Sequence, residues 1–220
     1  MQSNTSCPGL HPLHDMYLDA FEGRFPPADG AVTVLGPPGD GLECSVAFTG
    51  HAVVATALPP DEVVTADEPG AAGPDGYGGS MAPDFLRRLA GPDGWVGVID
   101  LTLVAPGRGE PSLPRRTDAD GHDRVRRARA LRRNVDVYGD DRGLLTLADG
   151  LAGRREISIE TEPGGDGRGR SLLTAALGHV PAGEPVFAAV SPGNARSLRA
   201  FLAAGFVPVG SEVLLRPGRR

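Results

Sequence analysis

The sequence contains no lysine, and all 22 of its basic residues are arginine. Without lysine the chain cannot form a Schiff base with a carbonyl substrate, and it lacks the lysine with which a Walker-type P-loop holds phosphates. The absence argues against Walker-type nucleotide hydrolysis, although the chain has 32 glycines.

The chain also has few cysteines and no long apolar run. Cys7 and Cys44 lie far apart without metal-ligand spacing, so we expect two unpaired thiols. The five histidines show no metal-binding spacing either, and we predict no metal site. Because the N-terminus is polar and no apolar stretch approaches membrane-spanning length, we expect a cytoplasmic protein without a membrane partner.

The charge is unevenly distributed over the 220 residues. The net charge is −6, but residues 1–86 hold 1 arginine and 12 acidic residues, whereas residues 87–220 hold 21 arginines and 16 acidic residues. The segment 122–135, "HDRVRRARALRRNV", reads as a basic helix. Since the chain is acidic overall and this helix has no aromatic residues, we interpret its arginines as a solvated face and predict no nucleic-acid partner.

The first half of the chain is predicted to be rich in strands. Residues 31–35 read as a strand, and residues 42–58 read as a hairpin. Residues 59–80 are rich in proline, glycine and acidic side chains, which predicts a long, mobile surface loop and a domain boundary. Pro83 then suits the first turn of a helix that Gly91 ends.

The second half alternates more regularly. The segments "VDVYG", "GLLTLADG" and "REISIET" read as three short strands of an antiparallel meander. The order that follows is strand 155–161, a glycine-rich turn, helix 168–179, strand 185–190, helix 194–204 and strand 206–215. Strand and helix therefore alternate, which is typical of an α/β arrangement.

Two motifs in this half resemble those of the GNAT superfamily of N-acyltransferases. The segment "GGDGRG" (164–169) is similar to the superfamily's pyrophosphate loop at Gly167 and Gly169, with Gly164 where glutamine or arginine is usual. The segment "NARSLRAFLAAGF" (194–206) is similar to a later motif at Asn194, Ser197, Gly205 and Phe206. The resemblance covers about residues 120–216.

The resemblance implies the fold and the cofactor. We expect an α/β (α+β) fold with a GNAT-like, mixed and mostly antiparallel twisted sheet flanked by helices, and acetyl-CoA as the cofactor. Its pyrophosphate would lie on backbone N–H groups at the start of the helix 168–179, and its pantetheine arm between strands 155–161 and 185–190, which splay apart in this superfamily. The implied cofactor-binding residues are Ile159, Thr161, Gly165, Gly167, Arg168, Gly169, Arg170, Ser171, Asn194, Ser197 and Phe201.

The resemblance also nominates carboxylates for catalysis. Glu156 opens the fourth strand of the superfamily pattern, where many members have a glutamate that removes the amine proton. Glu160 shares its face by period-two alternation, and is the alternate base or a contact for the substrate ammonium. The same alternation also describes two ordinary solvent-facing residues of a half-exposed strand. Phe201 takes the place of the tyrosine that usually protonates the leaving thiolate, and phenylalanine cannot donate a proton.

The expected function is transfer of an acetyl group from acetyl-CoA to the amine of a small-molecule acceptor by direct attack. The alternatives are a weakly catalytic or non-catalytic acyl-CoA-binding module, and a different reaction on the same scaffold. We expect a β-rich N-terminal region at 1–82, an acyltransferase domain at 83–220, and a monomer or homodimer. Residues 1–82 are an acceptor-site subdomain, a degenerate second GNAT half or a dimerisation element.

Overall fold

A computed structural model describes residues 10–65, 73–162 and 167–219, which fold into two compact units. Unit 1 is Met1–Asp100 with Val209–Arg220, and unit 2 is Leu101–Pro208. The sequence predicts a division earlier in the chain, after residue 82. The later division reflects packing, because helix α3 (Pro83–Ala90) buries Phe85 and Leu86 in a cluster with Val213 of unit 1.

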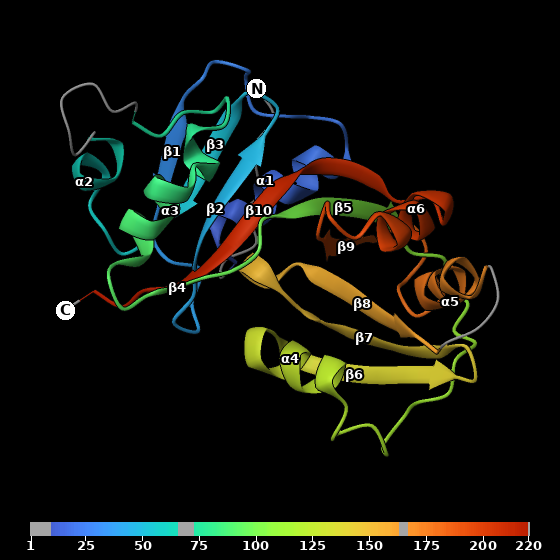
Figure 1. Ribbon diagram of the computed structural model, residues 1–220. Helices are drawn as coiled ribbons and strands as arrows, with labels where there is room; N and C mark the ends of the chain where they lie inside the picture. Colours follow the sequence, from blue (N-terminus) through green and yellow to red (C-terminus); the bar gives the residue numbers. More distant parts are fainter. Residues whose placement is uncertain (1–9, 66–72, 163–166, 220) are drawn as a thin grey trace. The chain divides into compact units, whose positions relative to one another are not determined.

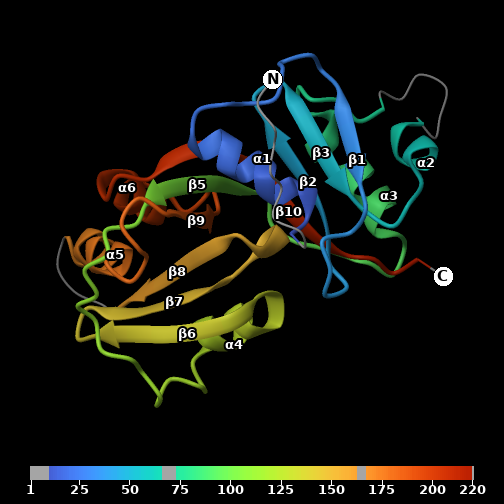
Figure 2. The ribbon, with the colours of Figure 1, turned by 180° about the vertical axis from the view of Figure 1, so that it is seen from behind.

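Unit 1 is a small sheet with helices (Figures 1 and 2). Strands β1, β3, β2 and β10 are neighbours in that order; β1 and β3 are parallel, the other pairs antiparallel, and β4 pairs with β10. The hairpin predicted at 42–58 is confirmed. The elements of unit 1 are α1 (Pro12–Phe21), β1 (Val32–Leu35), β2 (Glu43–Phe48), β3 (His51–Ala55), α2 (Pro60–Val64), the 3₁₀ turn η1 (Gly79–Met81), α3, β4 (Trp95–Val96) and β10 (Val207–Arg216), whose first residues belong to unit 2.

The segment 59–80, predicted as a loop, carries α2 and η1. Helix α2 begins where two prolines in succession fix the backbone at its start, and its Val63 is buried against unit 1. No helix in the described ranges is both long and apolar enough to cross a membrane.

Unit 2 holds the meander and the alternating segments (Figure 1). Strand order is β5–β9–β8–β7–β6, with antiparallel neighbours except for β8 and β9. The predicted meander and the mixed, mostly antiparallel sheet flanked by helices are confirmed. Its elements are β5 (Asp100–Pro106), α4 (Asp123–Leu131), β6 (Arg133–Asp140), β7 (Gly143–Asp149), the 3₁₀ turn η2 (Leu151–Gly153), β8 (Arg155–Thr161), α5 (Arg168–Leu177), β9 (Pro185–Val190) and α6 (Ala195–Ala203).

Helices cover both faces of the sheet in unit 2 (Figures 1 and 2). Alternate residues of a strand point to opposite faces, so Ile157 and Ile159 share one face of β8 while Glu156 and Ser158 share the other. The isoleucine face packs in the main core with residues of α5 and α6. Helix α4 contacts the opposite face, because it packs on β6, β7 and β8. The polar face of β8 therefore lies under α4.

Candidate active site

Strands β8 and β9 separate along their length. Among the residues described, their parallel pairing is confined to one position, Glu156 with Phe187. Beyond it, β8 stays paired with β7 as far as Thr161, and β9 stays paired with β5. Every second residue of 157–161 directs its N–H and C=O toward the side of β9, so this edge offers backbone groups to an extended ligand. The expected splay of these two strands is thus present in unit 2.

Helix α5 begins at the open end of β8. Its N-cap, Gly167, has φ of +93°, a left-handed conformation that glycine adopts without strain, and a Cβ there would meet nothing within 4 Å. A Cβ on Gly169 would lie 3.7 Å from a methyl of Thr161 and 3.5 Å from the Cβ of Ala200. The end of β8, the first turn of α5 and helix α6 therefore meet at this point.

The first turn of α5 can donate to an anion. The Ser171 amide donates to the carbonyl of Gly167 at 2.9 Å, and the first N–H groups of a helix have in general no partner within the helix. Such unpaired N–H groups and the helix dipole favour negative charge. Gly165, expected in the same loop, lies outside the described residues.

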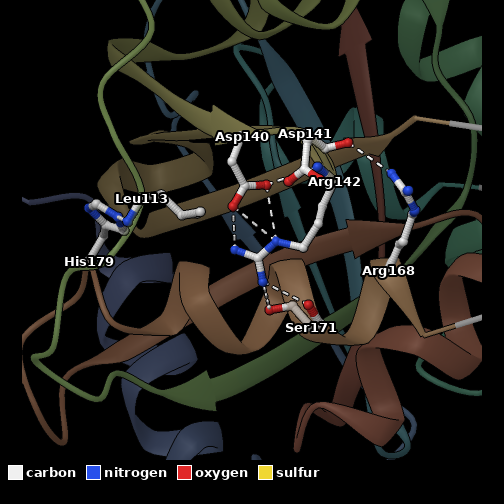
Figure 3. Close-up of polar contacts among 7 residues, drawn as sticks. All are labelled: Leu113, Asp140, Asp141, Arg142, Arg168, Ser171 and His179. Carbon is white, nitrogen blue, oxygen red and sulfur yellow. Dashed lines mark hydrogen bonds and ion pairs between the residues drawn. The ribbon is translucent and has the colours of Figure 1, made fainter.

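Arginines connect this first turn to the hairpin between β6 and β7 (Figure 3). Arg142 is paired with Asp140 through Nη2 at 2.6 Å, and its Nη1 donates to the Ser171 hydroxyl at 2.7 Å. Arg168 donates to the carbonyl of Asp141 at 2.8 Å. Hydrogen bonds from Arg142 hold the pKa of Asp140 below its usual value. The hairpin thus fixes the start of α5, a role of Arg142 that its position in a predicted turn does not reveal.

Helix α6 starts with a side-chain cap. The Asn194 side chain accepts a hydrogen bond from the Ser197 amide at 3.1 Å, which satisfies one of the free donors of the first turn. Asn194 is exposed and Ser197 is half-buried. Asn194 and Ser197 follow β9 in the chain and form the start of α6.

Glu156 does not occupy the setting expected of a catalytic base. Its side chain is buried, with the whole residue 4% exposed, and pairs with Arg132 at 2.5 Å and with Arg154 at 3.2 Å. Burial raises its pKa, but the two guanidinium groups outweigh that effect and the pKa is lowered. Glu156 therefore does not face solvent, so that reading is wrong, while its role as a base stays a prediction.

Glu160 is the carboxylate of this strand face that solvent reaches. Its side chain is 49% exposed, and its Oε2 accepts a hydrogen bond at 3.1 Å from Nε of Arg124 in the first turn of α4. Two residues before it, Ser158 shares a hydrogen bond of 2.7 Å with Thr146 and is buried. This face of β8 therefore carries polar side chains along its length, from the buried Glu156 to the exposed Glu160.

Phe201 lies in the core of unit 2. The residue is 4% exposed, and its ring packs edge-on against Phe206 with the ring centroids 4.9 Å apart. The expected contact with a cofactor has little surface available, because helix α6 turns this side chain into the main cluster. The motif position of Phe201 therefore serves packing in this chain.

Three solved structures are similar to part of the chain. A candidate acetyltransferase of the GNAT family from Novosphingobium aromaticivorans is 19% identical with a TM-score of 0.38, covering 58% of this chain and 69% of that one. A conserved protein of unknown function from Staphylococcus epidermidis is 13% identical with a TM-score of 0.36, covering 56% and 62%. A GCN5-related N-acetyltransferase from Kribbella flavida is 11% identical with a TM-score of 0.36, covering 58% and 61%.

Two of these three neighbours are described as members of the superfamily that the sequence motifs resemble. The three likenesses cover between 56% and 58% of this chain. No protein-family model matches the sequence, and no curated protein is significantly similar to it.

Proposed function

We propose that this protein is a GNAT-type N-acetyltransferase that moves the acetyl group of acetyl-CoA to the amine of a small-molecule acceptor. The observation that carries the proposal is the separation of β8 and β9 after their single paired position. It leaves a backbone edge that ends at the glycine-capped start of α5, so an extended thioester and its phosphates have adjoining places to bind.

The residues of unit 2 fit coenzyme A. Gly167 leaves open space at the start of α5, where the amides of Arg168, Gly169 and Arg170 can donate to the pyrophosphate. Ser171 and the side chain of Arg170 are exposed beside them. Ile159 and Thr161 on β8 and Asn194 and Ser197 on α6 flank the pantetheine arm in this proposal.

Acetyl-CoA supplies an acyl group activated as a thioester. The chain has to hold that group, polarise its carbonyl and accept the proton of the attacking amine. A backbone N–H of β8 between 157 and 161 polarises the carbonyl. Glu160 accepts the amine proton, directly or through water, or holds the acceptor's ammonium before it loses that proton; Glu156 takes no proton, because two arginines hold its carboxylate ionised.

Calorimetric titration with acetyl-CoA and with CoA tests the proposal. The wild-type protein should bind both, and Gly167→Asp should lose binding because it places a carboxylate where the phosphates lie. Gly167→Asn is the uncharged isostere, and it should keep most of the affinity. Gly205→Asp is a matched control, because Gly205 also has a left-handed φ, of +100°, and no atom near its absent Cβ, but lies at the far end of α6.

The acceptor experiment follows the binding experiment. Thiol release from acetyl-CoA is measured with a panel of small amines, and Glu160→Gln should lower kcat/KM by about 10²-fold or more, as for loss of a general base. Absence of acetyl-CoA binding in the folded wild-type protein would remove the proposal.

A second candidate is an acyl-CoA-binding protein with little or no turnover. Phe201 favours it, because the position that holds the acid tyrosine in the superfamily pattern carries a buried ring without a proton to donate. The two candidates differ in one result. Tight acetyl-CoA binding without thiol release for any amine supports the binding protein.

A further inference from the structure

Three side chains of unit 1 form a chain of hydrogen bonds, the Asp29–His51–Thr33 triad. His51, at the start of β3, places its Nδ1 2.9 Å from Oδ1 of Asp29 and its Nε2 2.9 Å from the hydroxyl oxygen of Thr33 on β1. The side chain of His51 is 9% exposed and that of Asp29 is 47% exposed, while Thr33 is half-buried. A carboxylate, an imidazole and a hydroxyl in this order are the groups that activate an oxygen nucleophile.

The carboxylate of the triad decides where the protons lie. Hydrogen bonds from His51 and from the Ala31 amide lower the pKa of Asp29, so this carboxylate is ionised and accepts. In a neutral imidazole the proton then lies on Nδ1, which leaves Nε2 as the acceptor for the Thr33 hydroxyl. His51 therefore faces the Thr33 hydroxyl as a base, and Asp29 fixes the orientation of its ring.

Thr33 lies on β1, the last strand at one end of the described sheet (Figure 1). Amides of β3 and of the residue after it donate to the carbonyls of Ala31 and Leu35, so the odd-numbered residues of β1 direct their backbone groups toward β3. The N–H of Val34, the residue after Thr33, is therefore directed to the other edge of the strand. An N–H directly after the nucleophile is a donor of the kind that stabilises an oxyanion.

An aromatic ring lies next to two members of the triad. Tyr77 is 71% exposed, and its hydroxyl donates to the Ala28 carbonyl at 3.2 Å. A Cβ on Gly30 would lie 2.6 Å from the Tyr77 ring and a Cβ on Gly50 would lie 3.3 Å from it, so the ring packs on the glycine after Asp29 and the glycine before His51. A large ring that is held in place and exposed offers an apolar surface to a bound molecule.

We propose that the triad is an esterase site that hydrolyses carboxylic esters with apolar groups, a function that does not depend on the proposed acetyl transfer. Oγ1 of Thr33 bonds to the ester carbonyl carbon while its proton passes to Nε2 of His51, and the Val34 N–H donates to the oxyanion. The bond between that carbon and the alcohol oxygen then breaks, and the alcohol leaves with the proton. Water attacks the acyl-Thr33 ester and gives a proton to Nε2, which returns it to Oγ1 as the carboxylic acid leaves.

The probe is p-nitrophenyl acetate, whose hydrolysis is followed by absorbance without acetyl-CoA present. Wild-type protein should hydrolyse it faster than buffer does, and mass spectrometry of the quenched reaction should find one acetyl group on the peptide that contains Thr33. Thr33→Ser keeps the hydroxyl and should keep the activity, whereas Thr33→Val keeps the shape and should lose both hydrolysis and acetylation. His51→Gln should slow hydrolysis by about 10²-fold or more, as for loss of a general base.

Thr65→Val is the matched control, because Thr65 is an exposed threonine of unit 1 whose hydroxyl donates to the Asp61 carbonyl of its own helix at 2.6 Å. It should change neither hydrolysis nor acetylation. Thermal unfolding checks that each variant folds, and if His51→Gln does not, the proteins with threonine, serine and valine at position 33 decide. Wild-type hydrolysis no faster than buffer, full activity of folded Thr33→Val, or acetylation of other residues alone would overturn the proposal.

Discussion

Replacing Glu156 by glutamine distinguishes a structural carboxylate from a catalytic one. The side chain lies buried between Arg132 and Arg154, and the latter is 0% exposed. Removing one partner of a buried ion pair leaves an uncompensated charge and costs about 3–5 kcal/mol. Glutamine keeps the shape and an acceptor oxygen, so the loss is that of the negative charge. We expect Glu156→Gln to lower the free energy of unfolding by about 3–5 kcal/mol.

This loss is large for a natural protein. Typical domains have unfolding free energies of about 5–15 kcal/mol, so the variant would keep about half to seven-tenths of a mid-range value of about 10 kcal/mol. In a chain of this length 1 kcal/mol shifts the melting temperature by about 2–4 °C, so Glu156→Gln should melt about 6–20 °C lower. Denaturant unfolding followed by circular dichroism measures the free energy, and thermal unfolding measures the shift.

Glu160→Gln is the control on the same strand face. Its side chain is 49% exposed and its ion pair with Arg124 is solvated, so its loss should cost less than about 1 kcal/mol. The two variants should therefore have opposite profiles: Glu156→Gln unstable, Glu160→Gln stable but impaired in acetyl transfer. A Glu156→Gln protein with wild-type stability and no transfer activity would refute the structural role and return the carboxylate to catalysis.

Three further predictions concern the surroundings of the site. Burial lowers the pKa of His179 below the 6.5 of an exposed histidine, so as the pH falls the unfolded chain takes up the proton before the folded protein does. The free energy of unfolding should therefore be highest above about pH 6.5 and decline below it until the folded pKa is passed. His179→Gln should flatten this decline, as measured by denaturant titrations at several pH values. Gly143→Ala should lower the free energy of unfolding by about 1–3 kcal/mol or more, because φ is +143° and a Cβ would lie 2.1 Å from a backbone carbonyl oxygen of β8. Gly183→Ala is the control, because Gly183 also has a positive φ but no atom near its absent Cβ, and it should cost about 1 kcal/mol by thermal unfolding. Equal losses in the two variants would show that the close carbonyl oxygen does not matter. Arg142→Ala removes one of the two side-chain links between the hairpin and the first turn of α5, since Arg168 still binds the Asp141 carbonyl. It should weaken CoA binding by calorimetry without abolishing folding, and unchanged affinity would show that the start of α5 does not need this link.

Much of unit 2 was predictable because its signals are local. Strand 185–190 and the strand 155–161 agree with β9 and β8 to the residue, since each is a short apolar or alternating run bounded by glycine or proline. Helix 194–204 is close to α6, because Asn194 caps it and Gly205 ends it. A turn glycine or a helix cap acts on residues only a few positions away, so the pattern of a single sequence is enough to reveal it.

The setting of Glu156 was not predictable in the same way. Period-two alternation gives the face on which a strand residue lies, but not what covers that face. Here α4 covers it, and Arg132 at the end of that helix and Arg154 beside β8 reach the carboxylate from separate elements. The division of the chain depends on similar long-range packing, because Val213 in the last strand joins the cluster around α3.

The buried ion pairs of Glu156 lie where β8 and β9 separate, and this position lets them help to shape the site. Glu156 is the β8 residue that pairs with Phe187 of β9, and the guanidinium of Arg154 lies 5.3 Å from the centre of the Phe187 ring. Separating these residues would expose or unpair buried charge, so the strands are held together at this position. Beyond it no such cluster joins β8 to β9 among the described residues, and the edge from Ile157 to Thr161 stays available to a ligand. The carboxylate that sequence patterns nominate for proton transfer thus lies at the position from which the binding edge opens.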